Sequence, residues 1–223
     1  MEFILIVVIG IVGFIVQNRL QSVFNKYSKV LAPGGMTGRE AAEKMLRDYG
    51  IKDVKVVSVK GRLTDHYNPV NKTLNLSASV YNSNSVAALA VAAHECGHAV
   101  QHAEGYAPLK MRSALVPVVQ FSSTWAQIIL IVGILLINTF PALLYLGIAM
   151  FAMVVLFSFI TLPVEYNASD RALDWLERSN SLTQTQVGQA KITLKWAART
   201  YVVAALSALA TLLYYLGIAR DND

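Results

Sequence analysis

Long apolar runs separated by polar segments dominate the pattern of this chain. Residues 3–16 form a run of 14 positions without a polar side chain. At 1.5 Å per residue, such a helix covers only about 21 Å of a hydrocarbon core that is roughly 30 Å thick. Because Glu2 is the only charged residue before the run and no small-residue cleavage site follows it, we predict an uncleaved N-terminal membrane anchor over 1–20 rather than a secretory signal.

Three further apolar segments predict membrane spans. Residues 115–137 and 141–162 are separated only by the short turn 138–140, so we predict a transmembrane hairpin over 114–162. The apolar end of the chain predicts a C-terminal transmembrane helix over 201–223. The predicted fold class is therefore a mainly α integral membrane protein with four transmembrane helices.

The polar segment 21–113 has the pattern of a small α+β lobe. Thr37 and Glu40 have capping-box spacing at the start of a helix, and runs of β-branched residues and turn residues follow. Ser85 supplies N-cap chemistry for a longer helix. We predict the following elements: a helix over 38–49, a strand over 54–59, a hairpin of strands over 62–67 and 73–79, and a helix over 86–103. Residues 163–200 form a second polar segment, which we predict to be helical.

Composition supports the membrane assignment, and charge predicts its orientation. The chain is 55% hydrophobic and only 15% charged, whereas soluble domains contain about 25% charged residues. Of the 19 Lys and Arg residues, 13 lie in 17–113 and five in 163–200. The positive-inside rule therefore places both polar segments in the cytoplasm. The net charge of +5 is spread along the chain without basic runs interleaved with aromatics, which argues against nucleic acid as a partner.

The predicted helix 86–103 contains a pattern that is typical of a zinc site. His94-Glu95-Cys96-Gly97-His98 fits H-E-x-x-H, so both imidazoles project from one face of the helix and can bind one Zn²⁺. Glu95 lies one residue along, where its carboxylate can take a proton from a zinc-bound water. The alternative is a coincidental match, which would leave two His and a Glu on an otherwise apolar helix.

A third zinc ligand is required, and Glu165 is the best candidate. It follows Pro163, where we expect the chain to leave the membrane and to begin a helix on the same side as His94. The alternative is an acidic residue that stabilises a helix N-terminus. His102 lies eight residues after His94 and about 80° around the helix from it, so it either orders the site from outside the ligand set or caps the helix end.

Other residues have weaker claims. His66, in the predicted hairpin, is either a substrate contact or an ordinary surface residue, and the strand that carries it could pair with an extended peptide. The only cysteine, Cys96, excludes an intrachain disulfide and points away from the metal side of its helix. Tyr106, Tyr166 and Arg171 are weaker candidates for stabilising an oxyanion.

Several runs resemble one known family of membrane proteins. These runs are 63–67, 76–77, 80–81, 91–102 and 162–169, and together they are similar to the YugP-type membrane zinc metallopeptidases, a gluzincin-like group. The order of H-E-x-x-H, membrane hairpin and later glutamate also resembles the HtpX-type and CAAX-prenyl membrane proteases. The resemblance implies that His94, His98 and Glu165 hold Zn²⁺ and that Glu95 is the catalytic base.

One position departs from the HtpX-type pattern. Those enzymes have an Asp four residues after the ligand Glu, where it orients a ligand His. This chain has Ser169 there and Asp170 one residue further on, so the residue with that role stays open between them.

The function that we expect is that of a zinc-dependent endopeptidase acting on membrane or membrane-proximal peptides and proteins. We expect it in the plasma membrane of a bacterial cell, with the active site on the cytoplasmic side. Beyond the substrate and the lipid bilayer, partner subunits in the membrane or a homo-oligomer are open alternatives. The rival interpretation is a non-enzymatic scaffold whose zinc is structural. Such a closed site needs four protein ligands, and His102 is the only candidate for the fourth.

Overall fold

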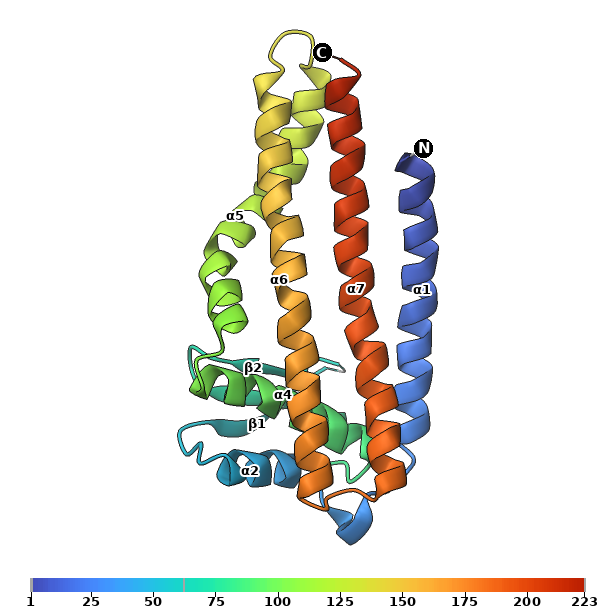
Figure 1. Ribbon diagram of the computed structural model, residues 1–223, viewed down its shortest axis with the longest axis vertical. Helices are drawn as coiled ribbons and strands as arrows, with labels where there is room; N and C mark the ends of the chain where they lie inside the picture. The colour runs from blue at the N-terminus through green and yellow to red at the C-terminus, as the bar shows by residue number, and fades with distance from the viewer. Residues whose placement is uncertain (1, 62, 223) are drawn as a thin grey trace. The chain divides into compact units, whose positions relative to one another are not determined.

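The computed structural model of the protein describes residues 2–61 and 63–222 (Figure 1). Predicted boundaries at Met1, Arg62 and Asp223 lie outside these residues. The elements in chain order are α1 (Glu2–Tyr27), the short 3₁₀ helix η1 (Pro33–Gly35), α2 (Gly38–Asp48), β1 (Lys55–Val59), β2 (His66–Asn68), β3 (Thr73–Ser77), α3 (Ala78–Tyr81), α4 (Val86–Ala103), α5 (Ala107–Leu135), α6 (Ala142–Arg178) and α7 (Gln184–Arg220).

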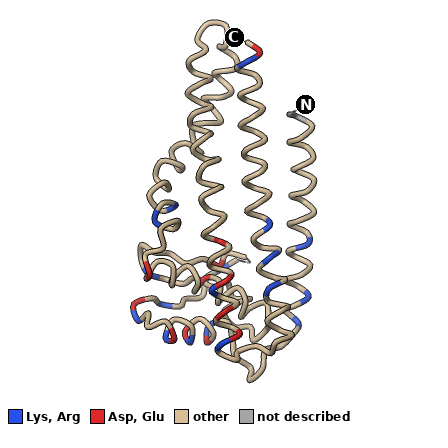
Figure 2. Tube along the Cα trace, in the orientation of Figure 1, with Lys and Arg blue, Asp and Glu red and all other residues tan. Residues whose placement is uncertain are grey.

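The predicted class of mainly helical protein with a small sheet is confirmed. Among the described residues, four helices are long and apolar enough to cross a membrane, namely α1, α5, α6 and α7. Figure 2 shows long stretches of these helices without a charged residue. In α5, α6 and α7 these stretches match the length that a bilayer core requires, since about 20 apolar helical residues span it.

The prediction that a new helix begins after Pro163 is wrong, because α6 runs without a break from Ala142 to Arg178. Proline has no N–H, so it removes one backbone hydrogen bond, and long apolar helices tolerate that loss. Upstream, the Thr161 hydroxyl donates to the Phe157 carbonyl, 2.8 Å away. Glu165 consequently lies inside a helix, and the alternative role of a helix N-terminal acid is excluded.

The chain forms two compact units, and the first contains Met1–Ile15, Lys110–Pro163 and Thr200–Asp223. Within it, Leu130 and Leu144 are buried where α5 packs against α6. Gly133 allows this close approach, since a Cβ there would lie 2.7 Å from the Leu144 backbone. Small residues at helix contacts are the usual way to bring two membrane helices together.

The second unit contains Val16–Leu109 and Val164–Arg199. Its largest cluster of buried side chains comes from α2, α4 and the sheet, together with residues of α6 and α7. The capping box of Thr37 and Glu40 begins α2 as predicted. Helix α4 has the predicted ends, because Ser85 accepts a hydrogen bond from the Ala88 N–H at its start. The mostly small, apolar residues of α4 make it a buried central helix.

The sheet has three strands in the order β1-β3-β2. The predicted hairpin is present, with β2 antiparallel to β3 and Tyr67 opposite Leu74, while β1 pairs parallel to β3. Strand β2 begins at His66, later than predicted, because Gly61 and Leu63 before it have positive φ. Strand β3 ends at Ser77 rather than at the predicted residue 79, because α3 begins at Ala78. The outcome is that β2 is an edge strand.

Candidate metal centre

Helix α4 brings His94 and His98 together because they lie one turn apart. Their ring centroids are 4.9 Å apart and their planes are almost perpendicular, at 83°. The His94 side chain is 14% exposed and that of His98 is 11% exposed. Both side chains are therefore largely withdrawn from water, and they lie on the same face of the helix.

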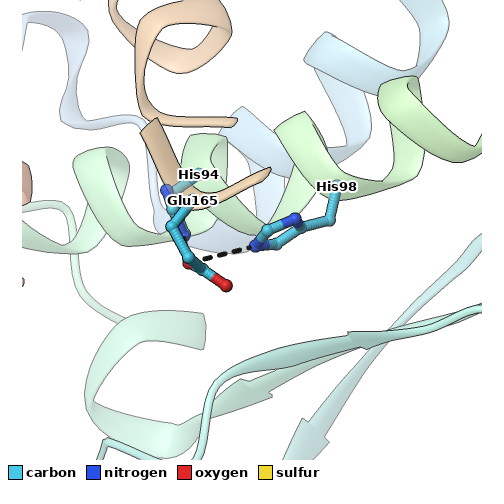
Figure 3. Close-up of side chains that lie close together, drawn as sticks. All are labelled: His94, His98 and Glu165. Atoms are coloured by element: carbon cyan, nitrogen blue, oxygen red, sulfur yellow. Dashed lines mark hydrogen bonds and ion pairs between the residues drawn. The ribbon is translucent and has the colours of Figure 1, made fainter. Parts of the chain in front are cut away.

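Glu165 of α6 completes a cluster with the two imidazoles (Figure 3). Its Oε2 atom lies 3.3 Å from His94 Nε2 and 3.6 Å from His98 Nε2, and its side chain is only 3% exposed. One ligand atom from each of the three residues lies within 4.8 Å of the others. Two ligands of a tetrahedral zinc, each 2.0–2.2 Å from the ion, lie roughly 3.3–3.5 Å apart. The donor types fit a zinc ion, and the two distances from the Glu165 carboxylate to the imidazoles lie close to this spacing.

The crossing of α4 and α6 depends on a glycine between the two histidines. A Cβ at Gly97 would lie 2.5 Å from the Ala168 carbonyl oxygen and 3.0 Å from its Cα. No side chain fits in that space, so the two helix backbones are in direct contact. This close approach is what brings Glu165 within reach of imidazoles that come from a segment more than 60 residues earlier.

Glu95 is buried beside the cluster without belonging to it. Its Oε2 atom accepts a hydrogen bond of 3.1 Å from the backbone N–H of Tyr67 in the edge strand β2. Because the donor is a main-chain group, this contact holds the carboxylate against the sheet whatever the side chain at position 67. The edge strand and the predicted base therefore lie together.

The remaining predicted residues are placed as follows. His102 is exposed, and its Nδ1 lies 2.8 Å from the Tyr67 hydroxyl rather than among the ligand atoms. His66 is exposed, with its Nδ1 2.8 Å from the Thr64 carbonyl. Asp170 is exposed on α6, whereas its neighbour Ser169 is buried with its Oγ 3.1 Å from His94 Nδ1.

The oxyanion candidates are also separated by the structure. Tyr166 is 45% exposed and faces away from the buried side of α6, on which Glu165 lies. Arg171 forms an ion pair of 2.7 Å with Glu104. Arg171 thus has a carboxylate partner of its own, and the oxyanion roles of Tyr106, Tyr166 and Arg171 stay predictions.

Two polar residues at the site were not predicted, Gln101 and Asn167, whereas Ser169 was one of the two candidates for orienting a ligand histidine. Gln101 lies 3.1 Å from His98 and Asn167 contacts Gln101 at 2.9 Å. A signal for Gln101 was present, because a residue three positions after His98 lies on the same helix face. Nothing local marks Asn167, whose partner is 66 residues away in the chain.

Burial and charge shift the pKa values of His98 and Cys96, two of the titratable groups of α4. Burial lowers the pKa of His98, but its contact with the Glu165 carboxylate, together with the nearby charge of Glu95, outweighs burial and raises the net pKa above the ordinary imidazole value. Burial raises the pKa of the Cys96 thiol well above its usual value. Cys96 therefore stays protonated and contacts the Ala42 carbonyl of α2 rather than any ligand.

Comparisons with known proteins agree with this chemistry. Residues 2–220 match the family described as "Putative neutral zinc metallopeptidase". The chain is 42% identical over 224 residues to "Putative membrane protease YugP" of Bacillus subtilis (strain 168), and the match covers 99% of this chain and 98% of that protein. No solved structure shows significant similarity to the chain.

Proposed function

Since the chain belongs to the family described as putative neutral zinc metallopeptidases, we propose that it is a membrane zinc endopeptidase whose metal is held by His94, His98 and Glu165. The observation that carries the proposal is the convergence of these three side chains within 4.8 Å, from α4 and α6. Two neutral nitrogen donors and one carboxylate are a common ligand set of catalytic zinc.

The chemistry is the addition of water to a peptide carbonyl followed by cleavage of the C–N bond. A zinc ion at this site would supply a Lewis acid that acidifies water and polarises the scissile carbonyl. Glu95 takes the proton from the attacking water and delivers it to the amine that leaves. The Tyr67 N–H supports this role, because it holds one carboxylate oxygen of Glu95 in place.

Three ligands rather than four favour catalysis over a structural zinc. Structural sites are usually closed by four protein ligands, whereas catalytic sites keep a position for water or substrate. Among the described residues, the cluster of potential ligands consists of three members. His102, the only fourth candidate from the sequence, is bonded to Tyr67 instead. This contact argues against the rival scaffold interpretation.

The proposed substrates are peptides or proteins in or near the bilayer. Four helices long enough to cross a membrane support a location in the plasma membrane, and the name of the Bacillus relative also contains "membrane protease". The division into an anchor, a hairpin, a C-terminal span and two polar segments supports a cytoplasmic active site by the positive-inside rule. Edge strand β2, which has a sheet neighbour on one side only, offers main-chain groups to an extended peptide.

The experiment that tests the function uses Glu95→Gln in the purified full-length chain. This change is nearly isosteric and keeps both imidazoles, but an amide cannot accept the proton of water. Zinc content, measured by elemental analysis, should stay near one ion per chain, and hydrolysis of a casein-type substrate should fall by roughly 10²–10⁴-fold.

Two outcomes would refute this function. Wild-type hydrolysis that survives complete removal of zinc would exclude metal-dependent catalysis here. A Glu95→Gln variant that keeps both zinc and full activity would remove Glu95 from the reaction and favour the scaffold.

A further inference from the structure

Gln101 is a fully buried amide one turn after His98 in α4. Its Oε1 atom lies 3.1 Å from His98 Nδ1. Its Nε2 atom lies 2.8 Å from the Val164 carbonyl oxygen and 2.9 Å from Asn167 Oδ1, both in α6. A buried side-chain amide with three partners is well satisfied, and each partner restricts how the amide can point.

The Val164 carbonyl and the Arg171 Nε–H stand at the two ends of this hydrogen-bonded group, and together they fix the direction of every hydrogen bond in it. The Val164 carbonyl can only accept, so the NH₂ group of Gln101 must face it. At the other end the Arg171 Nε–H can only donate, and it lies 2.8 Å from Asn167 Oδ1. The Asn167 oxygen is thereby turned toward Arg171 and toward Gln101.

These constraints leave one orientation for the Gln101 amide. Both hydrogens of its NH₂ group are used on α6, and its oxygen faces His98. An amide oxygen can only accept, so the Nδ1 atom of His98 must carry a hydrogen. In a neutral imidazole the other nitrogen then has the lone pair. That nitrogen, Nε2, is the atom 3.6 Å from the Glu165 carboxylate.

We propose that Gln101 is a positioning residue that fixes the tautomer of His98. Arg171, acting through Asn167, helps to set which end of the Gln101 amide faces His98. This relay of hydrogen bonds, which runs from Arg171 through Asn167 and Gln101 to His98, keeps the hydrogen on Nδ1 and the lone pair of Nε2 toward Glu165. The consequence for zinc rests on the proposed function, because it assumes that Nε2 binds the ion. The tautomer itself does not depend on that assumption.

The relay ends at the protein surface in the ion pair of Arg171 and Glu104, whose atoms are 2.7 Å apart. The Glu104 carboxylate is half exposed, so this pair contributes little stability of its own. Its role is to hold the guanidinium where its Nε–H reaches Asn167. Substitution of Gln101 should therefore have a large effect on zinc affinity and on the His98 tautomer, and substitution of Glu104 a smaller one.

The first test replaces Gln101 by methionine, which has a similar length but neither donates nor accepts. Removing the partner of a metal-binding imidazole typically weakens metal binding by roughly 10–100-fold. We expect a rise of that size in the zinc dissociation constant of Gln101→Met, measured by competition with a chelator in the purified full-length chain.

Gln189→Met is the matched control. Gln189 of α7 belongs to the same compact unit, and its Oε1 is buried without a hydrogen-bond partner among the described residues. The same change of residue type there should leave zinc affinity unchanged. Equal losses in the two variants would mean that Gln101 acts only through packing, and the proposal would be wrong.

The second test reads the tautomer directly and needs neither zinc nor activity. In zinc-free protein labelled with ¹⁵N-histidine, at a pH where the imidazoles are neutral, wild-type His98 should show its hydrogen on Nδ1 only. Its signals are assigned by their loss in His98→Ala. Gln101→Met should show a mixture of tautomers.

Asn167 supplies the conservative comparison. Asn167→Asp keeps an acceptor oxygen for Gln101 and Arg171, so it should keep the wild-type tautomer. Asn167→Leu leaves only the Val164 carbonyl to hold the Gln101 amide, so it should show a smaller share of the other tautomer than Gln101→Met does. A wild-type tautomer in Gln101→Met would overturn the proposal. A wild-type chain that binds no zinc would overturn the proposed function, while the NMR comparison would still decide the role of Gln101.

Discussion

The Ser169 hydroxyl of α6 lies 3.1 Å from Nδ1 of His94, on the opposite side of the imidazole from the nitrogen that faces Glu165. When Nε2 has the lone pair, Nδ1 carries the hydrogen and Ser169 accepts it. The helix that supplies the carboxylate of the cluster thus also supplies a partner for one imidazole. Partners of this kind orient metal ligands and strengthen metal binding.

Ser169→Ala should weaken zinc binding by roughly tenfold, because His94 loses the acceptor of its Nδ1–H. Asp170→Ala, at the neighbouring exposed position, should leave zinc binding unchanged. Chelator competition with the two purified variants measures both effects. The opposite ranking would assign the orienting role to Asp170.

Gly97→Ala should lower stability and zinc content together. Alanine is favoured over glycine in a helix by about 1 kcal/mol, so helix propensity alone predicts a gain. The new Cβ would lie 2.5 Å from the Ala168 carbonyl oxygen, however, and both helices would have to move apart. Overpacking of this kind costs roughly 1–3 kcal/mol.

The control for that change is Gly188→Ala in α7, where a Cβ would meet no atom within 4 Å. That variant should be neutral or slightly stabilised and should keep its zinc. Thermal unfolding and elemental analysis of both variants in detergent check the prediction. A Gly97→Ala chain with full zinc and a raised melting temperature would show that the backbones need not be in contact.

Glu165→Gln should lose zinc and activity together, in contrast to Glu95→Gln. An amide oxygen is an uncharged and weaker zinc ligand than a carboxylate, whereas the shape of the side chain is nearly unchanged. Elemental analysis beside a proteolysis assay separates the two roles. If Glu165→Gln kept its zinc and Glu95→Gln lost it, ligand and base would be assigned in reverse.

Zinc binding should weaken as the pH falls through the pKa of His98, which lies above the ordinary 6.5. Only the neutral imidazole binds zinc. Above this pKa no proton has to leave, and below it each zinc displaces one proton from His98, so affinity falls by up to about tenfold per pH unit.

An NMR titration of His98 in zinc-free protein checks the cause of this shift. The Glu165 carboxylate raises the pKa of His98, so the pKa should fall in Glu165→Gln. An unchanged pKa in that variant would mean that Glu165 does not hold His98 in its charged form, and the predicted onset of zinc loss above the ordinary value would fail.

The orientation in the membrane can be tested by thiol labelling in whole cells. Thr139→Cys and Asn222→Cys should react with an impermeant reagent, whereas Val70→Cys and Glu177→Cys should not, because the positive-inside rule places only the first two outside the cell. All four positions are exposed in the fold, so burial does not explain a difference in labelling. The native Cys96 should stay silent, because burial raises the pKa of its thiol. The reverse labelling pattern would place the active site outside the cell.

Features that depend on nearby residues could be predicted from the sequence. The ends of α4 follow from the Ser85 cap and an apolar run, and the pairing of His94 with His98 follows from helix geometry. The long apolar helices follow from composition, since a bilayer core sets their length. Each of these depends on interactions within a few residues or on the solvent that a segment requires.

Prediction failed where a local preference competed with the rest of the fold. Pro163 is a strong signal for the end of a helix, yet α6 continues through it because one lost hydrogen bond is small beside the packing of a helix of 37 residues. Strand β2 begins later than the predicted strand over 62–67, because Gly61 and Leu63 turn the chain with positive φ before it.

The sequence by itself determined which residue types can hold a metal and that two of them share a helix face. Only the tertiary structure decided what surrounds them, because the partners of His94 and Gln101 come from α6, more than 60 residues later in the chain. Which residues of α6 become these partners depends on how closely the two helices approach. From the sequence, the glycine at position 97 indicates only that a close approach is possible. Hydrogen-bond direction, and with it the nitrogen of His98 that carries the hydrogen, exists only once both helices are packed.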